Sequence, residues 1–203
     1  NIPFELIFNS FLIGFVVALA ASVIAVILSL GSFKNSNRIF FNLSTIGYAI
    51  PGSVIAVALL LVFNFYFGLS MTVFGIWGLF LCLLIRFITP LIRYLDAALS
   101  NMTQETLSAT KIYSKSLLKT FRNIYLPALY PSLLLGFLVV FIEVIKEQPA
   151  TLLLRPVGFD TLSSKIYNFT SEGQWELAAT PSIAMILLSL ILVLVLNNRV
   201  DSE

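Results

Sequence analysis

Long stretches without a single charged residue dominate the chain. About 20 consecutive apolar residues suffice for a helix to cross the hydrocarbon core of a bilayer, so each stretch is long enough to span it. Because the stretches lack the period-2 alternation of barrel strands, and because lipid offers backbone polar groups no outside partner, they predict helices. The uncharged stretches are 6–33, 39–85, 123–142 and 177–198, and the second is long enough to cross twice.

The pattern therefore predicts an all-α polytopic membrane protein whose single domain, 1–203, has five spans. Gly31 and Ser32 end the first span, and an aromatic turn from Asn64 to Gly68 separates the second from the third. Pro90 is expected to kink the third span. The expected spans are about 4–30, 46–66, 72–96, 127–147 and 181–196, with an outer loop at 148–180.

Composition excludes several classes of protein. Hydrophobic residues make up 59% of the chain and charged residues 11%, with a mean hydropathy of +0.98, whereas soluble domains carry about 25% charged residues. A soluble enzyme, a disordered chain and a nucleic-acid binder are therefore excluded. The chain has no histidine, which excludes catalysis or metal ligation by imidazole, and its lone cysteine, Cys82, is expected to serve packing.

The basic residues are divided unequally between the two sides of a five-span arrangement. Nine of the twelve fall on the side that holds 32–38, 97–124 and the C-terminus. Because basic loops stay in the cytoplasm, we predict an outer N-terminus and a cytoplasmic C-terminus. The nine residues are Lys34, Arg38, Arg86, Arg93, Lys111, Lys115, Lys119, Arg122 and Arg199.

The segment 103–123, between the third and fourth spans, is patterned as an amphipathic cytoplasmic helix. Lys111, Lys115 and Lys119 recur every four residues and so share one face, while aromatic and aliphatic residues share the opposite face. This pattern fits a helix at the lipid headgroups and equally a docking element for a soluble partner.

The same segment resembles the E-A-A-x3-G-x9-I-x-L-P loop of ABC importer permeases. Ala109, Ile124 and Pro127 match that loop, whereas Ser108 and Ser114 replace its glutamate and its glycine. In that family the loop inserts into a cleft of the ATPase subunit. The ATPase-coupling residues that the resemblance implies, with Glu105 as a substitute acid, are Glu105, Ser108, Ala109, Lys111, Ser114, Lys115, Lys119, Ile124 and Pro127.

The stretch 141–162 resembles the signature of ferric iron type I ABC permeases. It reads F-I-E-V-I-K-E-Q-P-A-T-L-L-L-R-P-V-G-F-D-T-L, against a usual form of E-x-x-K-E-x-P-A-T-L-L-L-R-P-x-G-F-D-T-L. The stretches 47–52 and 165–179 also agree with that family. The resemblance implies a five-span, MetI-like permease core that corresponds to the second half of a two-repeat polypeptide, and a start at Asn1 suits a piece of a longer chain.

The resemblance also implies a function and its partners. The chain would be a permease subunit of the bacterial plasma membrane, not an enzyme, and would pass ferric iron from an extracytoplasmic iron-binding protein to the cytoplasm. The implied partners are an ABC ATPase dimer, which uses the ATP, the binding protein and a second permease half. No P-loop occurs in the sequence, so the ATPase is expected to be another chain. We expect no cofactor bound by this chain, and no nucleic acid.

Two alternatives to this function stay open. The same machine could carry thiamine, a polyamine or a phosphonate, because substrate choice lies largely in the separate binding protein. A different class, a secondary transporter or channel, would use 103–123 only as an interfacial helix. A membrane enzyme is disfavoured by the missing histidine and by the lack of clustered acids within the spans.

Charged residues at the outer end of the fourth span have two interpretations. Glu143 and Glu147 lie four residues apart, and carboxylates suit Fe(III), so one interpretation is a transient contact with iron. The other is a structural ion pair with Lys146 or Arg155. The candidate residues for the outer gate or for docking of the binding protein are Glu143, Glu147, Pro149, Arg155, Gly158 and Asp160.

Two further features of the chain carry interpretations. The turn from Arg155 to Asp160 fits a docking face for the binding protein and also a brace of the gate region. Arg86 and Arg93, seven residues apart in the third span, are interpreted as snorkelling or bundle-facing cations on its cytoplasmic half.

Overall fold

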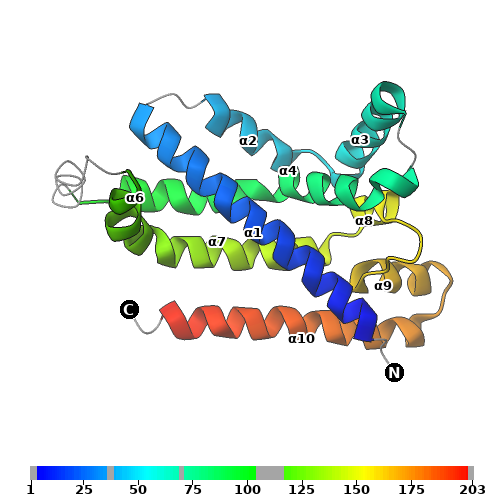
Figure 1. Cartoon of the computed structure of the whole chain (residues 1–203). Coiled ribbons are helices and arrows are strands. Elements are labelled where there is room, and N and C mark those ends of the chain that lie inside the picture. Colours follow the sequence, from blue (N-terminus) through cyan, green and yellow to red (C-terminus); the bar gives the residue numbers. More distant parts are fainter. Residues whose placement is uncertain (1–3, 36–38, 69–70, 104–116, 201–203) are drawn as a thin grey trace.

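A computed structural model describes residues 4–35, 39–68, 71–103 and 117–200. Every regular element that it describes is a helix, which confirms the all-α prediction (Figure 1). The helices are α1 (Phe4–Asn35), α2 (Ile39–Ala49), α3 (Gly52–Phe67), α4 (Met71–Ser100), α6 (Leu117–Thr120), a π-helical turn (Phe121–Tyr125), α7 (Leu126–Lys146), α8 (Pro149–Leu154), α9 (Leu162–Ser171) and α10 (Trp175–Val200).

The core lies where three long helices, α1, α4 and α7, pack against one another. In Figure 1, α4 and α7 run side by side and α1 crosses them. Small residues allow the close approach, since Gly14 of α1 lies against Phe141 and Gly136 of α7 lies against Leu91. α4 is the central helix, with 61% of its most apolar window buried, whereas the corresponding window of α10 is 11% buried.

Four described helices are long and apolar enough to cross a membrane: Phe4–Phe33, Phe74–Ser100, Phe121–Lys146 and Trp175–Leu194. The stretch Gly52–Tyr66 is apolar but shorter. It belongs to the predicted span 46–66, which the structure divides between α2 and α3. Pro51 has an extended backbone and no N–H to donate, and proline disfavours helical geometry in the residue before it, so α3 has to begin anew.

Of two further junctions between helices, one agrees with the sequence prediction and the other differs from it. Gly68 ends α3 in the left-handed conformation, with φ of 60°, inside the aromatic turn expected between the second and third spans. At the start of the fourth span, by contrast, helix is continuous from Leu117 through a π-helical turn into α7. Pro127, which has no N–H, lies two residues after the end of that π-helical turn, in the first turn of α7.

The two ends of the bundle carry different elements (Figure 1). One end holds the start of α1 together with α3, α8 and α9, and the other holds α6 and the last turns of α10. The ends of α1 and α4 also lie at the α6 end, so the elements that were expected on one side of the membrane gather there. The assignment of this end to the cytoplasm stays a prediction.

Candidate functional site

Glu147 lies at the point where α7 stops. Its backbone leaves the helix with φ of −69° and ψ of 118°, and Pro149 opens α8 two residues later. This change of direction turns the carboxylate inward, where only 7% of the side chain is exposed. There the Nη1 atom of Arg86, from the middle of α4, donates to Oε1 of Glu147 at 3.1 Å. An ion pair therefore joins α4 to the end of α7 inside the bundle.

The residue that bears this carboxylate is also bonded to the next two helices. Oε1 of Glu147 accepts from the backbone N–H of Ala150 at 3.4 Å, within the first turn of α8. Its backbone carbonyl accepts from Oγ1 of Thr151 at 2.8 Å and from Oγ of Ser163, at the start of α9, at 3.1 Å. Position 147 thus connects four helices: α4, α7, α8 and α9.

Gly52, the first residue of α3, packs directly onto this ion pair. A Cβ atom at Gly52 would collide with Nη1 of Arg86 and with Oε1 of Glu147, so only glycine allows α3 to approach so closely. The thiol of Cys82, also on α4, lies 3.7 Å from the backbone oxygen of Gly52. Helix α3 therefore begins on top of the ion pair.

The structure corrects two expectations about these charges and confirms a third, an ion pair between Lys146 and a neighbouring glutamate. Arg86 lies in the middle of α4 and pairs toward the α8 end of the bundle, not on the cytoplasmic half that was expected for it. Glu147 pairs with neither Lys146 nor Arg155, because α7 ends at Lys146 and the spacing of a continuous helix no longer holds. Lys146 instead pairs with Glu143 at 3.1 Å on the outside of α7. Arg93 is exposed on α4.

The turn between α8 and α9 is braced from within. Arg155 forms an ion pair with Asp160, and its Nη1 donates to Oγ of Ser164 at 2.9 Å. Ser164 and Thr161 form a reciprocal capping box at the start of α9. Burial lowers the pKa of the Arg155 guanidinium, although arginine stays protonated in proteins.

The same turn is tied to the start of α1. The side chain of Asn9 donates to the backbone oxygen of Asp160 at 3.0 Å, and Oγ of Ser10 accepts from the N–H of Leu162 at 2.8 Å. At the tip, by contrast, Val157 is fully exposed and Gly158 has φ of 85°. Arg155 and Asp160 thus brace the turn, which leaves the tip as the part that can contact a partner.

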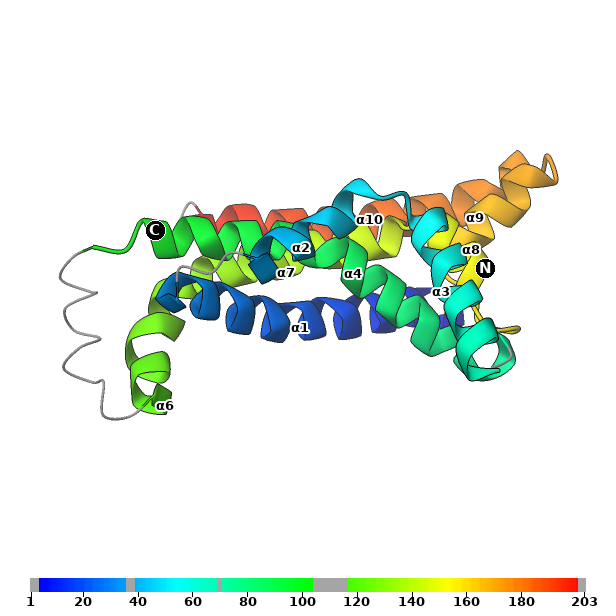
Figure 2. The ribbon, with the colours of Figure 1, turned by 90° about the horizontal axis from the view of Figure 1, so that it is seen from above.

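Most of the candidate coupling residues lie outside the described residues. This applies to Glu105, Ser108, Ala109, Lys111, Ser114 and Lys115. Of the others, Lys119 and Pro127 are exposed and Ile124 is partly buried. These three belong to α6, the π-helical turn and α7, at the end of the bundle away from α8 and α9 (Figure 2). The candidate residues therefore form two separate sites, one at each end of the bundle.

The described residues show no ready-made metal centre. They contain no group of three or more His, Cys, Asp or Glu side chains placed to hold a metal ion. Glu143 and Glu147 each bind a basic side chain, and they do so on different sides of the end of α7.

The sequence pointed to Arg86 and Glu147, and to Gly52 only within the stretch 47–52, but it did not show that the three residues meet. A usable signal existed, because isolated charges within apolar helices usually pair with one another. The contribution of Ser10 and Asn9 carried no comparable signal, since their partners lie about 150 residues away in the chain.

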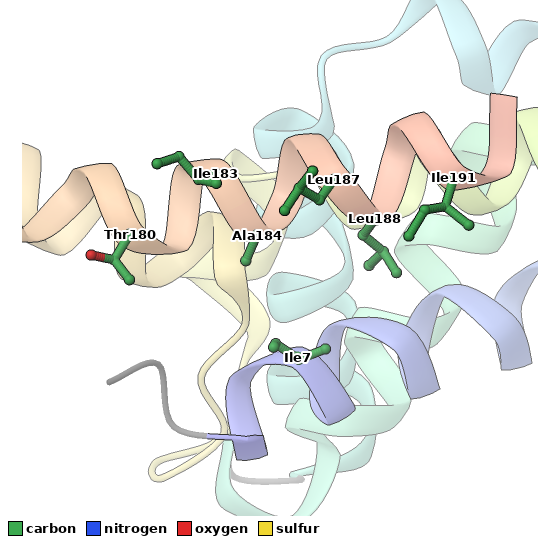
Figure 3. A pocket seen from close by; sticks show the side chains of 7 residues that line it. All are labelled: Ile7, Thr180, Ile183, Ala184, Leu187, Leu188 and Ile191. Atoms are coloured by element: carbon green, nitrogen blue, oxygen red, sulfur yellow. The ribbon is translucent and has the colours of Figure 1, made fainter. Parts of the chain in front are cut away.

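Two apolar grooves mark the sides of the bundle. The first, of about 430 Å³, lies between Ile7 of α1 and a row of α10 side chains that includes Ile183, Leu187 and Ile191 (Figure 3). The second, of about 370 Å³, lies between α1 and α4 beside Trp77 and Phe159. Neither groove adjoins the Arg86–Glu147 ion pair.

Comparisons with known proteins agree on one family. Residues 18–201 match the family described as "Binding-protein-dependent transport system inner membrane component". The chain is 31% identical over 143 residues to the Fe(3+)-transport system permease protein FbpB 2 of Haemophilus influenzae, an alignment that covers 70% of this chain and 27% of that protein. It is 27% identical over 125 residues to the ferric transport system permease protein FbpB of Actinobacillus pleuropneumoniae, covering 61% and 18%.

Among solved structures, the fold is similar to a chain of the methionine ABC transporter MetNI in an inward-facing conformation. The TM-score is 0.75 at 16% identity, with 97% of this chain and 94% of that chain covered, so the likeness concerns the fold. The aligned part of the chain spans about a quarter or less of the length of the curated relatives.

Proposed function

Because the chain belongs to the family of binding-protein-dependent transport system inner membrane components, we propose that it forms half of the permease of an ABC importer for ferric iron. The observation that carries the proposal is the family match over residues 18–201, together with relatives that are named as ferric permeases. Supporting it, the stretch that resembles the ferric signature, 141–162, builds the junction of α7, α8 and α9.

Driving force comes from outside this chain. A pair of ATPase subunits docks at the α6 end and moves the segment that includes Lys119, which continues through the π-helical turn into α7. ATP and the binding protein each favour one of two arrangements of the helices, and alternation between these arrangements moves the substrate. A second permease half completes the pathway.

The opposite end receives the extracytoplasmic binding protein. The exposed tip at Val157 and Gly158 offers the contact surface, and the bonds from Arg155 and Asp160 keep it in place. A braced turn suits docking because less conformational entropy is lost on binding. Iron enters here as the substrate. Glu143 contacts it in passing at the outer edge of α7, where its side chain is partly exposed.

Reconstitution with the partners tests the proposal. The chain, its second permease half, an ABC ATPase and an extracytoplasmic iron-binding protein are placed in proteoliposomes, and ATP-dependent uptake of radiolabelled ferric iron is measured. Thiamine, a polyamine and a phosphonate serve as competing substrates. Uptake of iron that requires both ATP and the binding protein is expected; uptake that needs only an ion gradient would indicate a secondary transporter instead.

Charge reversal tests the docking of the ATPase. The triple variant Lys111→Glu, Lys115→Glu and Lys119→Glu is expected to lose the co-purifying ATPase and the ATP-dependent uptake. Lys165→Glu, on α9 at the other end of the bundle, is the matched control and should keep both. A triple variant that retains the ATPase and the uptake would contradict the coupling role of this segment.

A further inference from the structure

Within the described residues, the predicted second span, 46–66, is broken once, between α2 and α3. The Arg86–Glu147 ion pair lies at this break. α2 ends at Ala49 and α3 begins at Gly52, so the pair beneath Gly52 is next to the hinge formed by Ile50 and Pro51. The two sides of this hinge are held differently. Gly47 packs against the backbone of Ile85, and the backbone oxygen of Ser44 accepts from Oγ1 of Thr89 at 2.9 Å, which fixes α2 to α4.

α3 packs on the bundle along one face only. Gly52 contacts the ion pair, and the ring of Phe63, near the other end of the helix, stacks on that of Phe74 of α4. The side chains on the opposite face are exposed along the length of the helix. Val57, Leu61 and Phe65 are among these exposed residues. A helix that follows a break and packs along only one face has few contacts to remake when its angle changes, as in hinge and shear motions.

Stability alone does not explain why this position holds a buried ion pair and not two apolar side chains. Removing two charges from water costs more than their attraction returns in many proteins, and apolar side chains of similar volume often stabilise a core as well. A buried pair is better explained where it selects one arrangement over another. Here it touches α3, α4 and α8 at once, so it can select the position of α3.

The pair also leaves a donor unused in this arrangement. The Nε atom of Arg86 is buried and makes no hydrogen bond within the described part of the chain. An unpaired buried donor raises the free energy of the arrangement that contains it. A second arrangement that supplies an acceptor to Nε would therefore compete with this one.

We propose that Arg86, Glu147 and Gly52 form a positioning clasp, which holds α3 against α4 and α8 in one state of the transport cycle and opens in the other. The proposal rests on the proposed function, because the clasp sets how strongly the binding protein at the outer end controls ATP hydrolysis at the other end. Opening would free α3 to turn about Pro51 while α2 stays fixed to α4. Arg86 and Glu147 act through the position of α3 and need not touch the substrate.

The first test measures coupling in the assembled transporter. ATP hydrolysis is compared with and without the binding protein in Arg86→Gln and Glu147→Gln. Each is expected to raise the rate without binding protein and to lower the stimulation ratio about fivefold, the lower end of usual allosteric coupling. The matched control is Glu176→Gln, which removes an exposed carboxylate from the first turn of α10.

A second variant changes the clasp without removing a charge. Gly52→Ala places a methyl group between Arg86 and Glu147 and is expected to lower the stimulation ratio in the same direction. Gly31→Ala is its control, because a Cβ at Gly31 in α1 meets nothing within 4 Å. Agreement between the charge variants and Gly52→Ala would assign the effect to the contact among the three residues.

A distance measurement separates failure of the clasp from failure of the proposed function. Spin labels replace the exposed Val57 of α3 and Tyr167 of α9 in the assembled transporter, with Cys82 changed to Ala. Without nucleotide, the distance distribution should be narrow in the parent and broad in Arg86→Gln. If a charge variant does not assemble, Arg86→Lys takes its place and should broaden the distribution less.

The outcomes are distinct. Charge variants that assemble with the ATPase and keep both the parental stimulation ratio and the parental distance distribution would overturn the clasp. A parent whose ATP hydrolysis does not respond to any binding protein would count against the proposed function, whereas the label distances would still decide whether the three residues position α3.

Discussion

Two ion pairs near the end of α7 have the same length and opposite settings. Lys146 and Glu143 lie 3.1 Å apart on the outer surface, where their side chains are 46% and 35% exposed, and Arg86 and Glu147 lie 3.1 Å apart in the interior, at 23% and 7%. The outer pair joins two turns of one helix and is partly exposed. The inner pair joins different helices and lies under a third. The comparison teaches that the surroundings of a charge, not the distance to its partner, decide how much stability is lost when its partner is removed.

Breaking the inner pair from one side should have the largest effect on stability. Glu147→Ala leaves Arg86 buried without its carboxylate, and we expect a loss of about 3 kcal/mol, whereas Glu143→Ala should cost less than about 0.5 kcal/mol. Labelling of the single buried Cys82 during heating, followed by mass spectrometry of its peptide, reports the unfolding. Equal losses for the two variants would refute the contrast.

Removing both inner charges sharpens the contrast. The double variant Arg86→Met and Glu147→Met should have a free energy of unfolding within about 1 kcal/mol of that of the parent, because no uncompensated charge remains. If the clasp exists, this variant keeps its stability and still loses the control of ATP hydrolysis by the binding protein. The same labelling assay and the stimulation ratio are measured on one preparation.

Overpacking the inner pair should have the next largest effect. Gly52→Ala makes the side-chain ends of Arg86 and Glu147 shift out of their contact, and we expect a loss of about 2 kcal/mol, typical of added volume in a tight site. Gly31→Ala should be neutral or slightly stabilising, since alanine favours a helix interior. Heating with Cys82 labelling compares the two, and an unchanged Gly52→Ala variant would contradict the close approach of α3.

A loss smaller than that of Gly52→Ala is expected at the brace of the outer turn. Thr161→Ala removes half of the capping box of α9 and should cost about 1 kcal/mol. Hydrogen exchange of the backbone amides should increase at the start of α9 and remain unchanged at Arg86 and Gly52. Faster exchange at Gly52 in this variant would show that the turn and the inner pair are not separate regions.

Much of the fold could be predicted from the chain of residues. Uncharged stretches predicted an all-α membrane protein, and a run of residues at 141–162 indicated the family that the comparisons support. The break in the helix at Pro51 was harder to predict, because Pro51 and Gly52 can begin a helix as well as interrupt one. A single span from 46 to 66 was the simpler interpretation of the same residues.

The sequence drew attention to Glu147 and Arg86 as charges near or within the spans, but it did not predict their contact. Glu147 was assigned to an outer pair because helical spacing places it on the face of Glu143, but that spacing holds only while the helix continues. Once α7 ends at Lys146, the backbone directs residue 147 to the opposite side. Arg86 was assigned to the cytoplasmic half because the count of basic residues treats each cation as belonging to a loop.

Local patterns determined which segments of this protein are helical and enter the membrane, since the cost of burying charge and unpaired backbone acts on each segment alone. Tertiary structure decided which charges meet. The pairing of Arg86 with Glu147 joins residues 61 positions apart, and the approach of Gly52 depends on a third helix. Such contacts depend on the relative positions of whole helices, and those positions follow from the packing of α1, α4 and α7, which no short stretch of residues encodes.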